Sequence, residues 1–549
     1  MIDYVCKYAP VEILAGFGEE SRLCNPQPNS FTAADKLTHR NICSFARSLI
    51  EIRSGESDGP LLLTNCCDSL RNVYDVLHAE GQEVFLLNLP HNQEHCGRLI
   101  YKNVLLKFIQ DFTVYSGKFF DCEKFRASFG KNEPEVASSY IALMGAKISD
   151  ELLEFVRSVS PLPVRNNTCT DIRRLGDPPL TNDVGKLLEW YAAELLTQSP
   201  CMRMTDVSAR RALIDDPNLK GIIYNTVNFC DFYGFEYAQI KRTLPVPILK
   251  IETDYTTEAA GQMKTRLEAY FENFTAPIVE KRAPTVHPKH REQRYTAGID
   301  SGSTSTNVVI LDNRLNIVSF SVLPTGVRVA ESAEKALNEA LHQAGLSKPQ
   351  IRYTVATGYG RTNINFREKD ITEISCHAKG AHFLNPAIRT VIDIGGQDSK
   401  VIRLDEKGAV KGFVMNDKCA AGTGRFLEMM AQSLALTLEE ISTCGLKWQE
   451  EITISSMCSV FAQSEVVSLI AADKKLADIV HGLNQSVAAK VTTLVGRAGM
   501  EREYMMTGGV AKNIGVVRAI EGKLGYPVFL PKEPEICGAL GAAIIAAEL

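Results

Sequence analysis

Two short loops hold the residues of this 549-residue chain that are best suited to bind a phosphate. In each loop an aspartate stands just before small residues: Asp300 before Gly302, Ser303 and Thr304, and Asp393 before Gly395 and Gly396. Small residues let backbone N–H groups and hydroxyls approach phosphate oxygens, and a nearby carboxylate holds Mg²⁺ through water. One such loop alone is more often an ordinary hairpin turn, because glycine serves any turn. Two of them indicate a nucleotide site.

The elements around these loops support that interpretation. Each aspartate ends an apolar stretch that predicts a strand, and a second predicted strand follows each loop, so each loop is the tip of a hairpin. Two copies of one hairpin predict duplicated domains with a cleft between them. Farther along, Gly508 and Gly509 follow another short apolar segment, where a glycine pair lets the backbone approach an adenosine. We therefore predict Asp300 and Asp393 as the catalytic carboxylates, which position magnesium or the attacking water.

Fifteen cysteines are the second feature with chemical potential, ten before residue 290 and five after it. The first residues lack a basic segment followed by an apolar one, so we expect no signal peptide and a cytoplasmic protein. In a reducing compartment cysteines seldom form a disulfide framework, which leaves metal or redox chemistry as the better explanation. Most free cysteines are nevertheless small buried hydrophobes, and we expect this of several here.

Composition narrows the range of partners. Hydrophobic residues make up 45% of the chain and charged residues 23%, as in ordinary globular proteins. The net charge of −5 disfavours a nucleic-acid surface. The sequence has no apolar run of the ~18 residues that a membrane span needs. We expect neither nucleic acid nor a membrane as a partner.

Short apolar runs that alternate with helical patterns predict an α/β architecture for the N-terminal half. The runs cover residues 59–65, 83–87, 140–144, 221–224 and 246–250. Runs of this length are typical of buried parallel strands. Ser149 is the predicted N-cap of the helix that follows the third run. We expect two Rossmann-like α/β subdomains that meet near residues 130–140.

A polar stretch with Pro277, Pro284 and Pro288 separates this half from the nucleotide loops. Its prolines and basic residues are typical of a linker. The predicted domains are therefore residues 1–273, a linker over 274–294, and residues 295–549.

Eight motifs follow one another through the C-terminal part: GIDSGSTSTNVVILD, ATGYGR, TEISCHAKGA, DIGGQDSKVI, NDKCAAGTGRFLE, SSMCSVFAQSEV, TGGVAKN and ICGALGAA. In this order they resemble the ATP-dependent activators of 2-hydroxyacyl-CoA dehydratases, relatives of the benzoyl-CoA reductase ATPase subunits. The resemblance implies a duplicated ATPase domain of the actin/hexokinase/Hsp70-like class and adds Gln397 to the ATP-binding residues. Asn307 stands where this family usually has lysine, and Gln463 where it usually has glutamate.

The same resemblance implies a homodimer that shares one [4Fe–4S] cluster, to which each subunit gives two cysteines. These correspond to Cys419 and Cys458. Both precede predicted helices, and a helix N-terminus stabilises a thiolate or an anionic cluster. The other cysteines of this half lack such a setting and are predicted to be buried fillers: Cys376, Cys444 and Cys537.

Six shorter motifs run through the N-terminal half: YAPVEI, CSFARS, NCCD, NLPH, NFCD and IETDY. They resemble the 2-hydroxyacyl-CoA dehydratase subunits, a family that includes the double-cubane cluster proteins. The resemblance implies a [4Fe–4S] cluster with one open iron, held by Cys43, Cys67 and Cys230. A double-cubane [8Fe–9S] cluster needs more thiolates, for which the candidates are Cys6, Cys66, Cys169 and Cys201. We expect no role in ligation for Cys24, Cys96 and Cys122.

Together these features predict an ATP-hydrolysing iron–sulfur reductase. Ferredoxin or flavodoxin would reduce the shared cluster, and ATP would close the cleft, since a ligand shifts an equilibrium only by stabilising one conformation over another. The electron would then pass to the N-terminal cluster and on to a small substrate.

Three alternatives remain open from the sequence. The first is reductive radical dehydration of a 2-hydroxyacyl-CoA together with a further subunit. The single dehydratase-like region of this chain favours the reductase over that reaction. A non-catalytic sensor of ATP or redox state is the second, because fold analogy alone does not fix function. Acetate- or sugar-kinase activity is the third and weakest, because cluster cysteines have no use there.

Overall fold

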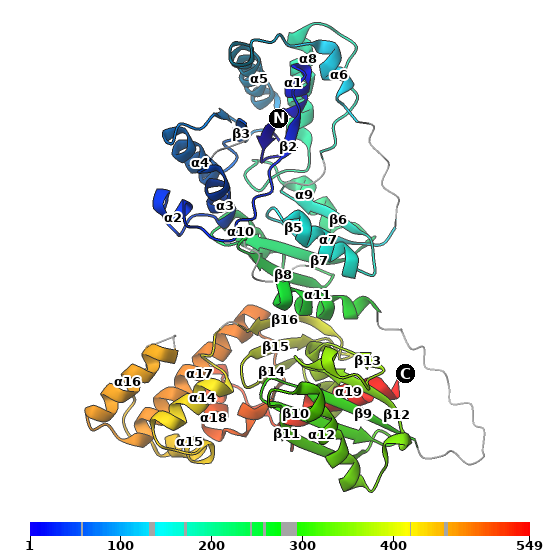
Figure 1. The fold of residues 1–549 in the computed structure, drawn as a ribbon, viewed down its shortest axis with the longest axis vertical. Coiled ribbons are helices and arrows are strands. Elements are labelled where there is room, and N and C mark those ends of the chain that lie inside the picture. The colour runs from blue at the N-terminus through cyan, green and yellow to red at the C-terminus, as the bar shows by residue number, and fades with distance from the viewer. Residues whose placement is uncertain are drawn as a thin grey trace, which may run out of the picture. The chain divides into compact units, whose positions relative to one another are not determined.

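The computed structural model describes residues 1–55, 59–130, 138–169, 173–241, 244–255, 260–275, 294–417, 419–454 and 459–549. The chain forms two compact units, Met1–Leu267 and Glu268–Leu549, coloured from blue to green and from green to red in Figure 1. The boundary falls within helix α11 (Ala260–Thr275). Among the helices that the structure describes, none combines the length and the apolar composition that a membrane crossing requires.

The first sheet of the N-terminal unit is four-stranded and parallel, in the order β2-β1-β3-β4. Its strands are β1 (Ile2–Tyr4), β2 (Ser21–Leu23), β3 (Leu61–Thr64) and β4 (Val84–Leu87). Because β2 and β4 lie on opposite sides of the central pair, the connections leave β1 and β3 in opposite directions. The carboxyl ends of β1 and β3 therefore form a topological switch point, where α/β sheets bind ligands.

The second sheet repeats this arrangement in the order β6-β5-β7-β8, again fully parallel. Its strands are β5 (Tyr140–Gly145), β6 (Val164–Thr168), β7 (Leu219–Val227) and β8 (Ile248–Thr253). Its switch point lies between β5 and β7. The unit thus has two α/β subdomains, each with a switch point of the kind at which α/β sheets commonly bind ligands.

The other helices of this unit that the structure describes lie around the two sheets (Figure 1). They are α1 (Val11–Gly16), α2 (Ala34–Leu37), α3 (Ser44–Arg53), α4 (Asp68–Ala79), α5 (His95–Ser116), α6 (Cys122–Ala127), α7 (Asp150–Val159), α8 (Val184–Thr197), α9 (Ser208–Ile214) and α10 (Asp231–Ile240). The predicted N-cap of α7 is confirmed, because the Ser149 hydroxyl accepts a hydrogen bond from the Leu152 N–H at 3.3 Å.

Helix α8 does not stay with the subdomain that its sequence position suggests. It packs against α5, and Leu187, Leu188 and Tyr191 are fully buried in the core under the first sheet. The first sheet lies before residues 130–140 and the second after them. The first subdomain nevertheless takes a helix from beyond that point.

The C-terminal unit contains two five-stranded sheets with the same topology. The first has the order β11-β10-β9-β12-β13, with β9 (Tyr295–Ser301), β10 (Ser305–Leu311), β11 (Ile317–Pro324), β12 (Ile351–Thr357) and β13 (Lys369–Asp370). The second has the order β16-β15-β14-β17-β18, with β14 (Thr390–Ile394), β15 (Ser399–Leu404), β16 (Val410–Asn416), β17 (Tyr504–Thr507) and β18 (Val528–Phe529). In both, the first three strands are antiparallel and the last two are parallel to the first. This duplication is the actin/hexokinase/Hsp70-like fold.

The helices of this unit are α12 (Val329–Ala344), α13 (Glu373–Leu384), α14 (Gly424–Ser433), α15 (Leu438–Cys444), α16 (Ser459–Ala471), α17 (Leu476–Ala498), α18 (Ile514–Leu524) and α19 (Cys537–Ala547). Helices α14 to α18 gather beside the second sheet (Figure 1). Helix α13 packs across α19. At this crossing Cys376 and Cys537 are fully buried, and each lies against a glycine of the other helix. Both cysteines therefore serve helix packing.

Candidate functional site

The C-terminal unit has two lobes, one around each five-stranded sheet. Asp300 and Asp393 occupy equivalent positions in these two lobes. Asp300 lies near the end of β9, paired in register with Asn307 of β10, and Asp393 lies near the end of β14, paired with Lys400 of β15. The aspartates are only 8% and 3% exposed. The two predicted hairpins are thus present, and the carboxylates stand at the same place in each.

The tips of the two hairpins meet. A Cβ atom on Gly396 would collide with the side-chain hydroxyl of Thr304, so only glycine allows the approach. Gly508 has a φ of +81°, and a Cβ there would lie 2.9 Å from an Asp393 carboxylate oxygen. Three loops of the unit therefore converge on the aspartates. The other predicted ATP contacts lie in the same loops, partly or fully exposed: Gly302, Ser303, Gly395, Gln397 and Gly509. Their role stays a prediction.

A buried cation that sequence reasoning missed lies beside Asp393. Lys400 is 3% exposed, and its ammonium lies 3.2 Å from Asp393, 3.3 Å from Glu373 and 2.8 Å from Asp398. Although burial opposes it, the three carboxylates raise the pKa of Lys400 well above its usual value. The lysine and its partners lie in the motifs DIGGQDSKVI and TEISCHAKGA, so the signal was present in the sequence.

His377 of α13 lies between the aspartates of the two lobes. Its Nε2 is 3.8 Å from Asp300 Oδ2, and its Nδ1 is 3.5 Å from Asp393 Oδ1. The Thr507 hydroxyl donates to the same Asp393 oxygen at 2.9 Å. Burial lowers the pKa of His377, which keeps the ring neutral at neutral pH. One helix therefore contacts both phosphate hairpins through one side chain.

The two aspartates differ in charge state because of their strand partners. Burial, Glu373 and Asp393 raise the pKa of Asp300 to about 7. Burial also opposes ionisation of Asp393, yet His377 and Lys400 lower the pKa of that carboxyl. Position 307, opposite Asp300, holds a neutral asparagine whose side-chain NH₂ donates to the Glu535 carbonyl at 3.0 Å. Asn307 therefore offers Asp300 no ammonium group from the neighbouring strand, whereas Lys400 offers one to Asp393.

This asymmetry predicts the pH dependence of ATP hydrolysis. As pH falls below about 7, Asp300 takes up a proton and loses the charge with which it is predicted to hold magnesium or water, so the rate should fall. Asn307→Lys should move this decline lower by roughly one pH unit or more, because an opposite charge within a few ångströms favours the ionised carboxyl. Rates measured from about pH 6 to 8 test this. A flat profile, or an unshifted one in Asn307→Lys, would contradict it.

The three cysteines predicted to hold the N-terminal cluster each occupy a helix N-cap. Cys43 precedes α3, Cys67 precedes α4 and Cys230 precedes α10. None of the three makes a side-chain cap hydrogen bond, but nearby backbone N–H groups act to lower the pKa of each thiol, those of Phe45 and Ala46 for Cys43 and one each for the other two. Helix N-termini and N–H donors stabilise thiolates and anionic clusters. The sequence did not foresee this common position.

The other four candidate thiols lie around these three. The Cys66 side chain contacts those of Cys6 and Cys67, and the Cys43 side chain contacts that of Cys230. These contacts lower the pKa of Cys6 to about 6 and of Cys43 to about 7. Cys169 and Cys201 interact electrostatically with each other and with Cys6. Seven cysteines thus gather near the carboxyl ends of β1, β3, β6 and β7.

Two buried lysines accompany these thiols. Lys7 is 2% and Lys147 is 5% exposed. The Lys147 ammonium donates to the Cys24 carbonyl, and both lysines favour ionisation of Cys169. A buried ammonium costs free energy unless negative charge lies nearby. The chemistry of this site, thiols with buried cations and N–H donors, suits an anionic iron–sulfur cluster.

Comparison with known proteins finds a matching family for each half of the chain. The family described as BadF/BadG/BcrA/BcrD ATPase matches residues 297–546. The activator of lactoyl-CoA dehydratase from Anaerotignum propionicum is 50% identical over 254 residues, which are 46% of this chain and 98% of that protein. This chain belongs to the BadF/BadG/BcrA/BcrD ATPase family. A second family, 2-hydroxyglutaryl-CoA dehydratase, D-component, matches residues 6–135 and 139–274. The chain therefore joins the two families.

Further relatives match the ATPase unit. The activating ATPase of (R)-2-hydroxyglutaryl-CoA dehydratase from Acidaminococcus fermentans is 44% identical over 46% of this chain and 96% of its own length. A benzoyl-CoA reductase component from Thauera aromatica is 31% identical over 45% of this chain and 92% of its own length. Among solved structures, the activator of the 2-hydroxyisocaproyl-CoA dehydratase from Clostridium difficile, with bound ADPNP, is 44% identical and matches 46% of this chain and 94% of its own, with a TM-score of 0.45.

In the ATPase unit, the position of Cys419 differs from the expected helix start. Helix α14 has Thr423 as its N-cap, so Cys419 lies in the preceding loop, beyond the first turn where the helix dipole acts. Its carbonyl accepts a hydrogen bond from the Asn416 side chain at 2.9 Å. Cys458 lies outside the described residues. The second departure from the family pattern, Gln463, donates to the Ser433 hydroxyl at 3.0 Å.

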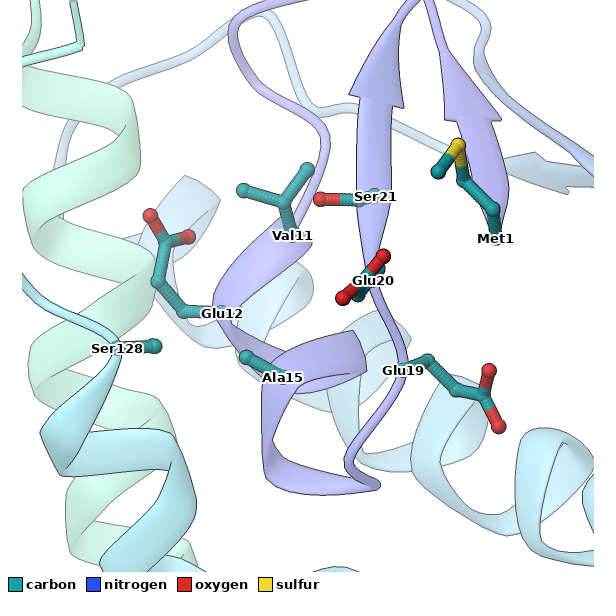
Figure 2. Close-up of a pocket in the computed structure, with 8 residues that line it drawn as sticks. All are labelled: Met1, Val11, Glu12, Ala15, Glu19, Glu20, Ser21 and Ser128. Carbon is teal, nitrogen blue, oxygen red and sulfur yellow. The ribbon is translucent and has the colours of Figure 1, made fainter.

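No mononuclear metal site is present in the described ranges, since no three His, Cys, Asp or Glu side chains there converge on one point. A [4Fe–4S] cubane takes its cysteines on different irons, so its ligands need not converge on one point. A pocket of 380 Å³ lies elsewhere, near α1 and β2 (Figure 2). Its Glu12 accepts from Arg173 and Tyr191, and its Glu19 from Lys118. With two of its three acids engaged and no cysteine in its lining, this pocket is not the candidate site.

Proposed function

We propose that this chain is an ATP-hydrolysing iron–sulfur reductase of the dehydratase-activator type. In this proposal ATP hydrolysis in the ATPase unit drives one electron from a [4Fe–4S] cluster, held by Cys419 and Cys458 of two subunits, to an N-terminal cluster. The donor cluster is oxidised by one electron and the acceptor is reduced by one, while ATP and water give ADP and phosphate. Ferredoxin or flavodoxin resupplies the electron, and a small substrate receives it.

One observation carries the proposal. A single chain joins an ATPase unit, whose phosphate hairpins meet, to a unit that gathers seven cysteines near two sheet switch points. Three of the seven are the helix N-caps Cys43, Cys67 and Cys230. Covalent linkage raises the effective concentration of donor near acceptor. Seven thiols exceed the three that one site-differentiated cubane takes, which supports a double-cubane [8Fe–9S] cluster with further ligands among Cys6, Cys66, Cys169 and Cys201.

The residues of the chain have distinct tasks in this proposal. When bound, the clusters supply one-electron chemistry at low potential. Asp393, paired with Lys400, holds magnesium, and Asp300 orients the attacking water. His377 contacts both aspartates and so responds to their separation. The N-terminal N-caps hold thiolates, and Lys7 and Lys147 compensate their charge.

The proposed assembly is a homodimer built around position 419 and the start of α16. Helix α16 exposes Phe461, Val467 and Ile470, which are 67%, 54% and 45% exposed. Exposed apolar side chains grouped on one element suit a protein–protein contact, here with a second copy. The predicted domain limits 1–273, 274–294 and 295–549 remain part of the proposal, as does a cytoplasmic location.

Reductive dehydration of a 2-hydroxyacyl-CoA is a second candidate. The match of the N-terminal half to the D-component of 2-hydroxyglutaryl-CoA dehydratase favours it. That reaction would require a further subunit, and this chain contains one dehydratase-like region. Turnover of an acyl-CoA that appears only when a second dehydratase protein is added would select this candidate over the reductase.

Replacement of Cys419 tests the donor half of the proposal. Cys419→Ser should lose the shared cluster and all ATP-dependent reduction of the N-terminal cluster, because a cluster held by two cysteines per subunit loses half its ligands. ATP binding should persist, since Cys419 precedes α14 and lies outside the phosphate loops. Iron and sulfide content after anaerobic purification measures the loss. Cys444→Ser, at the end of α15, is the matched control and should keep its iron. Full iron and an intact dimer in Cys419→Ser would contradict the assignment.

A further inference from the structure

The last turns of α11 belong to the ATPase unit, although the family match groups them with the dehydratase D-component. Residues 6–135 and 139–274 match the dehydratase D-component, and the ATPase match starts only at 297. Yet the ATPase unit begins at Glu268. Ala269 is fully buried in a core cluster of this unit, together with Ile374 and Ala378 of α13. The ATPase family match, residues 297–546, therefore leaves out the α11 side of this packing.

Glu272 provides the N-terminal cap of α13. Its carboxylate accepts hydrogen bonds from the Thr372 N–H at 2.9 Å and from the Thr372 hydroxyl at 2.5 Å. Thr372 is the N-cap of α13, and its own side chain caps no N–H of the helix. In a capping box a glutamate at the third position of the same helix makes the bond to the N-cap N–H. Here Ser375 holds that position, and α11 supplies the glutamate.

Glu268 is also linked to Asp300, through Arg361 and the loop at Gly358. Its carboxylate pairs with Arg361 at 2.7 Å, and the Arg361 guanidinium also donates to the Gly358 carbonyl at 3.2 Å. A Cβ on Gly358 would lie 2.5 Å from Asp300 Oδ1, so this loop rests directly on the carboxylate. The neighbouring Gly360 N–H donates to the Ser301 carbonyl at 2.9 Å. Glu268 thus acts on the loop that covers the first phosphate hairpin.

Both routes end at the carboxylates of the two lobes. Through Thr372, Glu272 contacts the helix that carries His377, which lies between Asp300 and Asp393. A movement of one lobe against the other must displace α13 or the 358–360 loop, because His377 of α13 contacts both aspartates and the loop contacts Asp300. Either displacement acts on the glutamates of α11. Toward the N-terminus, α11 continues without a break in the helix into residues of the other unit.

We propose that Glu268 and Glu272 couple the state of the nucleotide bound in the ATPase unit to helix α11, which leads into the N-terminal unit. This inference rests on the proposed function, because the coupling would serve electron transfer. The coupling itself involves only the bound nucleotide and helix α11. The glutamates act through Thr372 and Arg361 and are therefore positioning residues.

Hydrogen exchange of the full-length protein tests this coupling. With MgADPNP and with MgADP, amide exchange in α11 should differ about fivefold, since each bound state favours a different arrangement of α13. The double variant Glu268→Ala/Glu272→Ala should lose this difference. Glu440→Ala is the matched control: Glu440 accepts from the Thr437 N–H at 2.8 Å as the cap of α15, away from α11. It should keep the difference.

The outcomes separate a coupling role from a structural one and from failure of the proposed function. A purely structural role would change α11 exchange equally in both nucleotide states and leave the difference intact, which would overturn the inference. Equal loss of the difference in Glu440→Ala would overturn it too. Wild-type protein with no ATP-dependent reduction of the N-terminal cluster, but with the exchange difference present, would contradict the proposed function and leave the coupling standing.

Discussion

Lys400→Met should abolish ATP hydrolysis and lower the free energy of unfolding by about 3–5 kcal/mol, the cost of removing one partner from a buried ionic group. The lysine contacts Glu373, Asp393 and Asp398 within 3.3 Å and is almost fully buried. Without it, carboxylates remain buried with no compensating cation, and Asp393 loses the charge that holds its carboxyl ionised for magnesium.

Arg403→Met is the control for this variant. Arg403 follows on the same strand and pairs with Glu501 at 2.6 Å, but the two side chains are 25% and 34% exposed. An ion pair of this exposure contributes about 1 kcal/mol or less. The decrease in the free energy of unfolding of Lys400→Met should become smaller as pH falls toward about 4, because the carboxylates that have lost their cation take up protons. Chemical denaturation at two pH values, with hydrolysis rates, measures both effects. Equal losses in the two variants would contradict this explanation of the site.

Cys67→Ser should remove most of the N-terminal iron while ATP hydrolysis stays within about twofold of the parent. Serine is among the best N-cap residues, so the substitution removes a soft ligand without weakening α4. The same holds for Cys43→Ser and Cys230→Ser at α3 and α10. Iron counted in a Cys419→Ser background reports the N-terminal cluster alone.

Cys24→Ser is the matched control for these three variants. Cys24 is 5% exposed in the same unit, and its carbonyl accepts from Lys147, but it caps no helix. Its iron content should equal that of the background. If Cys67→Ser also keeps its iron, the N-terminal ligand assignment is wrong, whatever the ATPase unit does.

Much of the fold could be predicted because buried parallel strands have continuous apolar runs. The apolar runs at 59–65, 83–87 and 140–144 match strands β3, β4 and β5 to within two residues at each end. Strands β1 and β2 were missed because three residues give no pattern. The β6 sequence VRNNT was missed because it is polar, as suits its half-buried place at the sheet edge. The predicted subdomain limit near residues 130–140 does not account for helix α8, because long-range packing on α5 decides where that helix lies.

The site was predictable where one short segment contains it. The hairpin tips at Gly302 and Gly395 are local, so glycine and aspartate spacing indicates them. Lys400 and His377 were missed because strand register and a helix from between the lobes bring them to the aspartates. The helix predicted after Cys419 is present as α14, but its N-cap is Thr423, so Cys419 lies in the loop before it. Nothing in the sequence indicates that Glu272 caps a helix 100 residues away.

Electron transfer between the two clusters should depend on ATP hydrolysis, and EPR spectroscopy of the N-terminal cluster can measure this dependence. The protein is purified anaerobically, mixed with dithionite or reduced ferredoxin, and divided among MgATP, MgADPNP and no nucleotide. We expect an EPR signal from the reduced N-terminal cluster only where reductant and hydrolysable MgATP are both present, and none in Cys419→Ser under any condition. Equal reduction of the N-terminal cluster with and without MgATP would contradict ATP-driven electron transfer in this protein.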